Sequence, residues 1–176
     1  MSVELEAARA LVTAEDTQAW GRDLASRLRA GDVIVLTGEL GAGKTTLTQG
    51  LADGLGVRGP VTSPTFVIAR VHPSLVGGPA LVHVDAYRLG GAPELDDLDL
   101  DASTDESVTV VEWGHGLAEA LADSWLEIEL TRAVADDAAS AADGGAEGDD
   151  EEPADPRLVR LIGHGPRWEH SGIARS

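Results

Sequence analysis

The stretch "DVIVLTGELGAGKTTLTQGLADGLG" (residues 32–56) decides the fold of this 176-residue chain. It opens with a short apolar, β-branched run, which is typical of a buried parallel strand. A glycine-rich loop comes next, and the run after the loop predicts a helix over residues 45–56 that ends at a glycine. A strand, a glycine loop and a helix in this order form the context in which such a loop binds phosphate.

The loop residues 38–45 match the P-loop pattern G-x-x-x-x-G-K-[ST] in full. Glycines let backbone N–H groups turn inward as a nest for an anion, and the following helix adds the positive end of its dipole. Lys44 is expected to reach the β- and γ-phosphates, and Thr45 to offer its hydroxyl to Mg²⁺, which prefers hard oxygen ligands. The nucleotide-binding residues predicted from the loop are Glu39, Gly41, Ala42, Gly43, Lys44, Thr45 and Thr46.

Lys44 is the only lysine of the chain, because the other twelve of its 13 basic residues are arginines. We infer that lysine is required at this position because arginine cannot perform the same role. The phosphate nest needs a compact charge on a thin stem, whereas arginine ends in a wide planar fork. The single lysine therefore favours triphosphate binding over a glycine-rich turn that contains a lysine by chance.

The charge and composition exclude several classes of protein. The formal net charge is −18, and nine of the acidic residues lie within residues 134–156, where no basic residue occurs. Because nucleic-acid affinity comes largely from lysine and arginine, we expect no direct nucleic-acid binding. The absence of cysteine excludes disulfides and thiol catalysis. Without a signal-peptide pattern or a run of about 18 apolar residues, the expectation is a cytoplasmic protein that does not enter a membrane.

The flanking sequence predicts alternating helices and strands. Residues 13–32 predict a helix that Thr13 caps and Gly31 ends, and residues 116–124 predict another helix. Further strands are predicted at residues 65–71, 80–88, 107–113, 125–132 and 157–165. The predicted fold class is α/β, a P-loop NTPase-like domain with a largely parallel central sheet, flanking helices and a C-terminal β-hairpin.

Residues 133–156 interrupt this pattern. The segment is dense in acid, alanine and glycine and has no isoleucine, leucine or aromatic residue. It cannot bury enough apolar area to offset the entropy of ordering it. We therefore predict a disordered acidic insertion that lengthens the turn of the hairpin, within a single domain that spans residues 1–176.

Two carboxylates follow predicted strands. Glu112 ends "VTVVE", the position from which P-loop proteins hold Mg²⁺ opposite the loop hydroxyl. Asp85 lies in "HVDAYR", and ligands of a parallel sheet gather at the carboxyl ends of its strands. A structural salt bridge or a solvated strand end is the alternative for either residue alone. Together with the phosphate loop, the two carboxylates predict a metal and catalytic site.

Four segments in this order carry a resemblance to a known family: "TGELGAGKTTLTQGLADGLG", "VTSPTFVI", "HVDAYRL" and "VTVVEWG". They resemble the TsaE (YjeE) family, the small P-loop ATPases of bacterial tRNA threonylcarbamoyladenosine biosynthesis, over roughly residues 13–132 and the last strand. The resemblance implies the cofactors ATP and Mg²⁺ and the partner proteins TsaB and TsaD, of which TsaD performs the transfer. It also implies that ATP drives or resets the complex between turnovers.

The resemblance further implies roles for single residues. Glu112 is the second Mg²⁺ ligand beside Thr45, and Asp85 holds the attacking water or assists the metal. Thr65, with Ser63, belongs to a loop that closes over the γ-phosphate. Residues implied beside the nucleotide are Trp113 and, near its base, Thr17. Residues implied to support Asp85 are Tyr87 and Arg88.

Two other functions use the same loop. A small-molecule kinase usually carries an arginine-rich lid, yet the region between "VEW" and the acidic tract holds one arginine, Arg132. A non-catalytic switch, in which ATP binding alone gates assembly, differs from the ATPase only in whether turnover matters. A second acidic run, "ELDDLDLD" (residues 94–101), is either a solvated turn or a docking surface for a basic partner.

Overall fold

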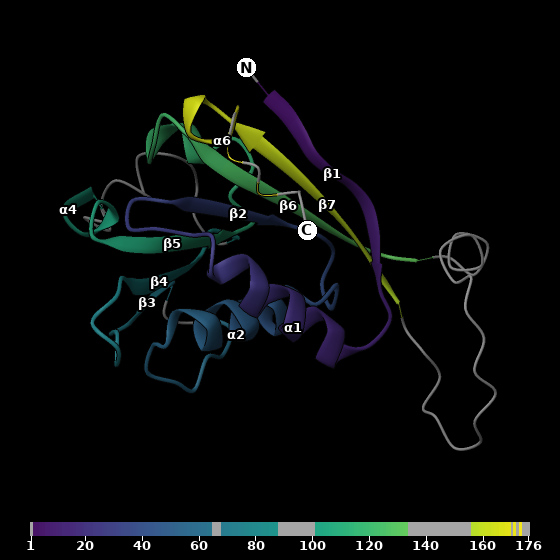
Figure 1. The fold of residues 1–176 in the computed structure, drawn as a ribbon, viewed down its shortest axis with the longest axis horizontal. Helices are drawn as coiled ribbons and strands as arrows, with labels where there is room; N and C mark the ends of the chain where they lie inside the picture. The colour runs from purple at the N-terminus through teal and green to yellow at the C-terminus, as the bar shows by residue number, and fades with distance from the viewer. Residues whose placement is uncertain are drawn as a thin grey trace.

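The computed structural model describes residues 2–64, 68–87, 101–133, 156–169, 171 and 173. In this part of the chain, seven strands form one sheet in the order β1-β7-β6-β2-β5-β4-β3 (Figure 1). The strands are β1 (Ser2–Leu11), β2 (Val33–Thr37), β3 (Ala69–His72), β4 (Ala80–Asp85), β5 (Ser107–Glu112), β6 (Trp125–Arg132) and β7 (Arg157–His164). The helices are α1 (Ala14–Ala25), α2 (Lys44–Leu55), α4 (Asp101–Thr104) and α6 (Pro166–Glu169), with a 3₁₀ turn η1 (Ala118–Ala120).

Only the centre of the sheet is parallel. Strand β2 pairs in parallel with β5 and β6, and β4 pairs in parallel with β5. The outer pairs β3–β4, β6–β7 and β1–β7 are antiparallel. This arrangement confirms a mixed α/β fold with a parallel centre, and β6 and β7 pair as the predicted hairpin. Because β2, β4 and β5 run the same way, their carboxyl ends meet at one edge of the sheet.

Helices α1 and α2 lie side by side on one face of the sheet (Figure 1). Helix α1 begins at the predicted cap, where the Thr13 hydroxyl accepts from the Asp16 N–H at 3.1 Å and the Asp16 carboxylate accepts from the Thr13 N–H at 3.0 Å. It ends at Ala25, several residues before the predicted end. The Asp32 carboxylate accepts from the Arg29 N–H at 2.9 Å, so residues 29–32 turn toward β2 instead of continuing the helix.

The two helices approach each other closely because glycine lies at their contact. A Cβ on Gly50 of α2 would overlap the backbone carbonyl of Gln18 on α1. Such contacts leave no room for a side chain and bring the helices to backbone distance. The start of α1 therefore lies near the start of α2, where the glycine-rich loop ends.

The core divides along the two faces of the sheet. Beneath α1 and α2 lie alternate strand residues such as Ile34, Leu36 and Leu81, all fully buried. On the opposite face, Val82, Val84 and Val111 pack against partly buried leucines near η1. The alternation follows from the two-residue period of a strand and fixes which side chains face α2.

Two sequence-based assignments were wrong. Residues 116–124 were predicted to be a helix but form only the short turn η1, because successive N–H groups bond three residues back, as from Leu121 to Ala118 at 2.9 Å. Strand β1 was not predicted. Its sequence "SVELEAARAL" favours helix locally, and pairing with β7 along the edge of the sheet overrides that preference.

Several predicted segments fall outside the described residues. Among them are residues 65–67 at the start of one predicted strand, Arg88, the acidic run 94–101 apart from its last residue, and residues 134–155 of the acidic insertion. The ends of that insertion are described, and the Ala133 N–H donates to the Pro156 carbonyl at 3.0 Å. No helix in the described ranges has the length and apolar character of a membrane span.

Candidate functional site

The glycine-rich loop connects β2 to α2 at the carboxyl edge of the parallel strands. Gly43, immediately before α2, has φ 102°, a conformation that glycine adopts without strain. Because glycine has no side chain to cap the helix, the first N–H groups of α2 stay open to an anion. The local sequence thus explains why the start of α2 has no side-chain cap.

The ammonium of Lys44 lies inside this loop. Its side chain is buried, and Nζ donates to the carbonyls of Gly38 at 2.7 Å and Glu39 at 2.9 Å. Nζ also lies 4.4 Å from the ring centroid of Trp113. Burial lowers the pKa of Lys44 from its ordinary value, while the charges of Glu112 and Asp85 act in the opposite direction.

Asp85 and Glu112 end neighbouring parallel strands and lie directly opposite each other in the β4–β5 register. Both side chains are buried, with exposed fractions of 5% and 3%. The Tyr87 N–H donates to Asp85 Oδ1 at 3.0 Å, so the backbone after β4 holds that carboxylate. Two buried carboxylates thus lie at the same sheet edge as the loop lysine.

A histidine that the sequence analysis did not single out belongs to this group. His83 is fully buried on β4, and its Nε2 lies 3.0 Å from Glu112 Oε1. It lies on the same face of β4 as Asp85, two residues away. The alternation in "HVD" was a usable signal, because a polar residue two positions before a predicted site carboxylate shares its face.

Trp113 directly follows Glu112 and has φ 59°, which is unusual for a large side chain. Its N–H donates to the Leu36 carbonyl at 3.2 Å, so the end of β5 is tied to the end of β2. Its ring contacts Tyr87 at a centroid distance of 5.2 Å. The two rings, 37% and 66% exposed, form an aromatic rim beside Lys44.

Two arginines of the hairpin end reach the other side of the loop. Arg132 and Arg157 pair in register across β6 and β7. Arg157 donates from Nε to the Ala42 carbonyl at 3.0 Å and from Nη2 to the Gly41 carbonyl at 3.2 Å, and Arg132 Nη2 lies 3.5 Å from the Gly41 carbonyl. The sequence analysis missed Arg157. Arg157 could have been found from the sequence, because the predicted hairpin places it opposite Arg132, at the C-terminal end of the acidic insertion.

Residues 11–139 match the family described as "Threonylcarbamoyl adenosine biosynthesis protein TsaE". The chain belongs to the TsaE family. A tRNA threonylcarbamoyladenosine biosynthesis protein TsaE of Streptomyces coelicolor is 57% identical over 155 residues, which are 88% of this chain and 95% of that protein. The protein of the same name from Bacillus subtilis is 41% identical and covers 72% of this chain and 78% of its own length. The crystal structure of Bacillus subtilis YdiB, 31% identical, matches with a TM-score of 0.69 over 99% of this chain and 97% of that one.

The family assignment leaves the roles of single residues as predictions. The structure brings together Lys44, Asp85, Glu112 and Trp113, and the half-buried Thr45 and Thr46 open α2 beside them. The other loop residues predicted to bind nucleotide, Glu39, Gly41, Ala42 and Gly43, lie between β2 and α2.

Four predicted residues stand apart from this group. Ser63 is exposed, and Thr65 and Arg88 lie outside the described residues. Thr17 is buried in α1, where its hydroxyl donates to the Thr13 carbonyl at 3.2 Å, so that hydroxyl is held by its own helix.

Two cavities of similar volume are candidate ligand sites. One has about 390 Å³ and lies beside the loop, lined among others by Gly38, Ala42, Trp113 and Arg132. Its lining residues Gly38 and Trp113 also contact the Lys44 ammonium.

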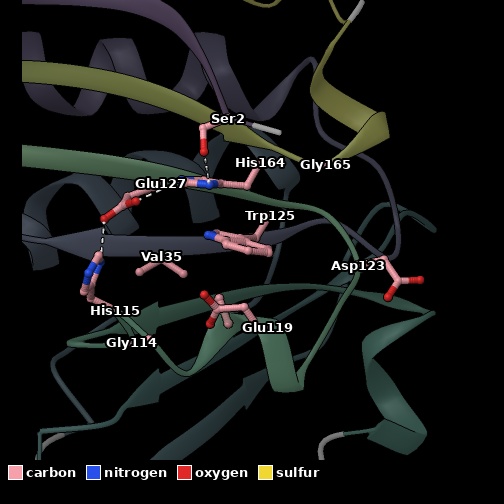
Figure 2. A pocket seen from close by; sticks show the side chains of 12 residues that line it. Ser2, Val35, Gly114, His115, Glu119, Asp123, Trp125, Glu127, His164 and Gly165 are labelled. Atoms are coloured by element: carbon pink, nitrogen blue, oxygen red, sulfur yellow. Dashed lines mark hydrogen bonds and ion pairs between the residues drawn. The ribbon is translucent and has the colours of Figure 1, made fainter.

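The other cavity, of about 440 Å³, lies on the face of the sheet that Val35 shares, away from α2 (Figure 2). Figure 2 shows Glu127 between two histidines. His115 Nδ1 lies 3.0 Å from Glu127 Oε1, and His164 Nε2 lies 3.0 Å from Glu127 Oε2. Ser2 Oγ lies 3.1 Å from His164 Nδ1. Glu119, Asp123 and Glu127 make this cavity acidic, which disfavours phosphate.

Proposed function

We propose that this TsaE-family protein is a Mg²⁺-dependent ATPase that acts with TsaB and TsaD to form N6-threonylcarbamoyladenosine in tRNA. ATP binding and hydrolysis would drive or reset that complex, and the transfer itself would belong to TsaD. The observation that carries the proposal is the position of Lys44. Its ammonium lies within the loop on two backbone carbonyls, at the sheet edge where Asp85 and Glu112 are buried.

Phosphate binding follows from the P-loop interpretation of residues 38–45. Nucleotide phosphates would lie against the first N–H groups of α2 and accept from the Lys44 ammonium in place of its two carbonyl partners. The ammonium would then contact full negative charges instead of neutral oxygens. Arg132 and Arg157, on the opposite side of the loop, add positive charge close to the same phosphates.

The residues present fit a magnesium ion. Mg²⁺ usually takes one or two protein oxygens together with phosphate oxygens and water. The Thr45 hydroxyl, in the first turn of α2, and the buried Glu112 carboxylate would supply the protein oxygens. When bound, the ion would neutralise charge on the phosphates.

Asp85 is the group that we propose orients the attacking water. Its Oδ1 is held by the Tyr87 N–H, which leaves Oδ2 to accept from a water beside the γ-phosphate. A carboxylate that is already held in place would orient the attacking water before the reaction, so less entropy would be lost on reaching the transition state. This assignment separates hydrolysis from binding, because Asp85 would act on the water and Lys44 on the phosphates.

The surface around the site supports a partner protein. Leu40, in the loop, is 91% exposed, and Tyr87 at the opposite rim is 66% exposed. Contiguous exposed apolar patches mark protein–protein contact sites, and we propose that these side chains belong to such a patch. The chain's net charge of −18 disfavours tRNA binding by this chain alone, so its partners would hold the tRNA.

The test uses the full chain with TsaB and TsaD from the same organism. Phosphate release and multiple-turnover formation of threonylcarbamoyladenosine are measured for the wild type, Lys44→Ala and Asp85→Ala. We expect Lys44→Ala to lose ATP binding, and Asp85→Ala to bind ATP but lose hydrolysis and turnover. Full modification with Asp85→Ala would support a switch without hydrolysis, and a wild type that binds no ATP would refute the proposal.

A further inference from the structure

His83 is a fully buried polar residue, and only one of its two ring nitrogens has a hydrogen-bond partner in the part of the chain that the structure describes. Its side chain is fully buried, and the residues beside it on β4, Val82 and Val84, are buried valines. Its Nε2 contacts Glu112 Oε1 at 3.0 Å, whereas Nδ1 is buried without a hydrogen-bond partner among the described residues. An unpaired buried nitrogen is unfavourable, so the contact with Glu112 is the polar interaction that His83 makes at this position.

The contact determines the tautomer of the ring. A carboxylate offers only acceptors, so the His83 nitrogen that faces Glu112 carries the proton and donates it. The proton between the two side chains is therefore on Nε2. One oxygen of Glu112 is thereby fixed, while Oε2 takes part in no hydrogen bond within the described part of the chain.

Glu112 bonds to His83 and not to Lys44 among the residues that the structure describes. The two charges attract each other through the buried space between them, yet they form no ion pair in the described residues. The ammonium instead contacts the carbonyls of Gly38 and Glu39. Without the bond from His83, Glu112 could turn toward the ammonium and occupy the charge that phosphate requires.

We propose that His83 is a positioning residue for the metal bound with the nucleotide. It holds Glu112 so that one carboxylate oxygen faces Mg²⁺ and the carboxylate does not neutralise Lys44. This inference rests on the proposed ATP and Mg²⁺ binding and adds a residue to it. Hydrogen bonds behind a metal ligand commonly change metal affinity by about 10- to 100-fold when they are removed.

The experiment measures how much Mg²⁺ tightens ATP binding, as the ratio of ATP dissociation constants in EDTA and in excess Mg²⁺, by isothermal titration calorimetry. We expect His83→Leu to lower this ratio by about tenfold. His83→Gln should restore most of this ratio, because the side-chain amide of glutamine places an N–H donor close to the position of the histidine Nε2. The control is His72→Leu, since His72 is also buried, bonds through Nδ1 to the Arg58 carbonyl and has an unpartnered Nε2.

The outcomes separate the inference from the proposed function. If wild-type protein binds no ATP, the proposed function fails. If wild type binds MgATP and His83→Leu retains the ratio that His72→Leu shows, the positioning role of His83 is refuted. Should His83→Leu not fold, the pair His83→Gln and His83→Asn decides, because the shorter amide cannot reach Glu112. Equal ratios in that pair would overturn the inference.

Discussion

Replacement of Lys44 by methionine removes the charge from the loop and keeps an unbranched side chain of similar length. In the free protein Lys44 is 7% exposed, and its ammonium donates to the carbonyls of Gly38 and Glu39. Because burial lowers its folded pKa, the unfolded chain binds this proton more tightly. The stability of the free wild type should therefore rise with pH between the lowered folded pKa and the unfolded value of about 10.4.

Lys44→Met should affect the affinity for MgATP and the stability of the free protein differently. A hydrogen bond to a charged group contributes about 1.5–3 kcal/mol, so its loss should weaken MgATP binding by about 10- to 100-fold. The melting temperature of the free variant should change little, because removal of a desolvated charge offsets the loss of its two hydrogen bonds to carbonyls. Lys44→Arg should bind almost as poorly as methionine, since the planar fork does not fit between two carbonyls and the Trp113 ring.

Isothermal titration with ATP and Mg²⁺, together with urea unfolding of the free proteins, measures both effects. An affinity within about twofold of wild type, for either variant, would refute the phosphate role of Lys44 and the argument from its uniqueness. A large fall in the free energy of unfolding with unchanged affinity would instead make Lys44 a structural residue of the loop.

Three further changes examine the metal ligand, the helix contact and the acidic insertion. Glu112→Gln should weaken Mg²⁺-dependent ATP binding and hydrolysis without lowering the melting temperature, and hydrolysis near the wild-type rate at saturating Mg²⁺ would contradict a ligand role. Gly50→Ala should destabilise the fold in urea, because about 1–3 kcal/mol of overpacking against the Gln18 carbonyl outweighs the roughly 1 kcal/mol that alanine gains in a helix. Gly78→Ala, at a loop glycine whose added Cβ meets nothing closer than 3.9 Å, is the control for an uncrowded site, and a Gly50→Ala variant more stable than wild type would contradict the close contact at Gly50. Deletion of residues 136–155 should leave the melting temperature and ATPase activity nearly unchanged, since the segment has almost no apolar side chains, and a melting point about ten degrees lower would mean that it packs.

Predictions from the sequence succeeded where local chemistry decides the structure. The strand before the loop, the start of α2 and its end at Gly56 lie within a residue of their predicted bounds, because a continuous apolar run and left-handed glycines act over a few residues. The Thr13 cap of α1 was also predicted from its neighbours. The helix predicted at residues 116–124 failed, since its composition favours helix but only short turns form there.

Long-range pairing decided the rest. Strand β1 exists because β7 offers an edge, and the pairing of Arg132 with Arg157 beside the loop depends on the register of a hairpin whose strands are more than twenty residues apart. The contact between His83 and Glu112 depends on the parallel register of β4 and β5, which side-chain packing under α2 selects. The sequence by itself determined a loop whose backbone is shaped for an anion, because glycine conformation and helix dipole are local properties. Which carboxylates, histidine and arginines surround that loop is a property of strands brought together from distant parts of the chain, and only the tertiary structure decided it.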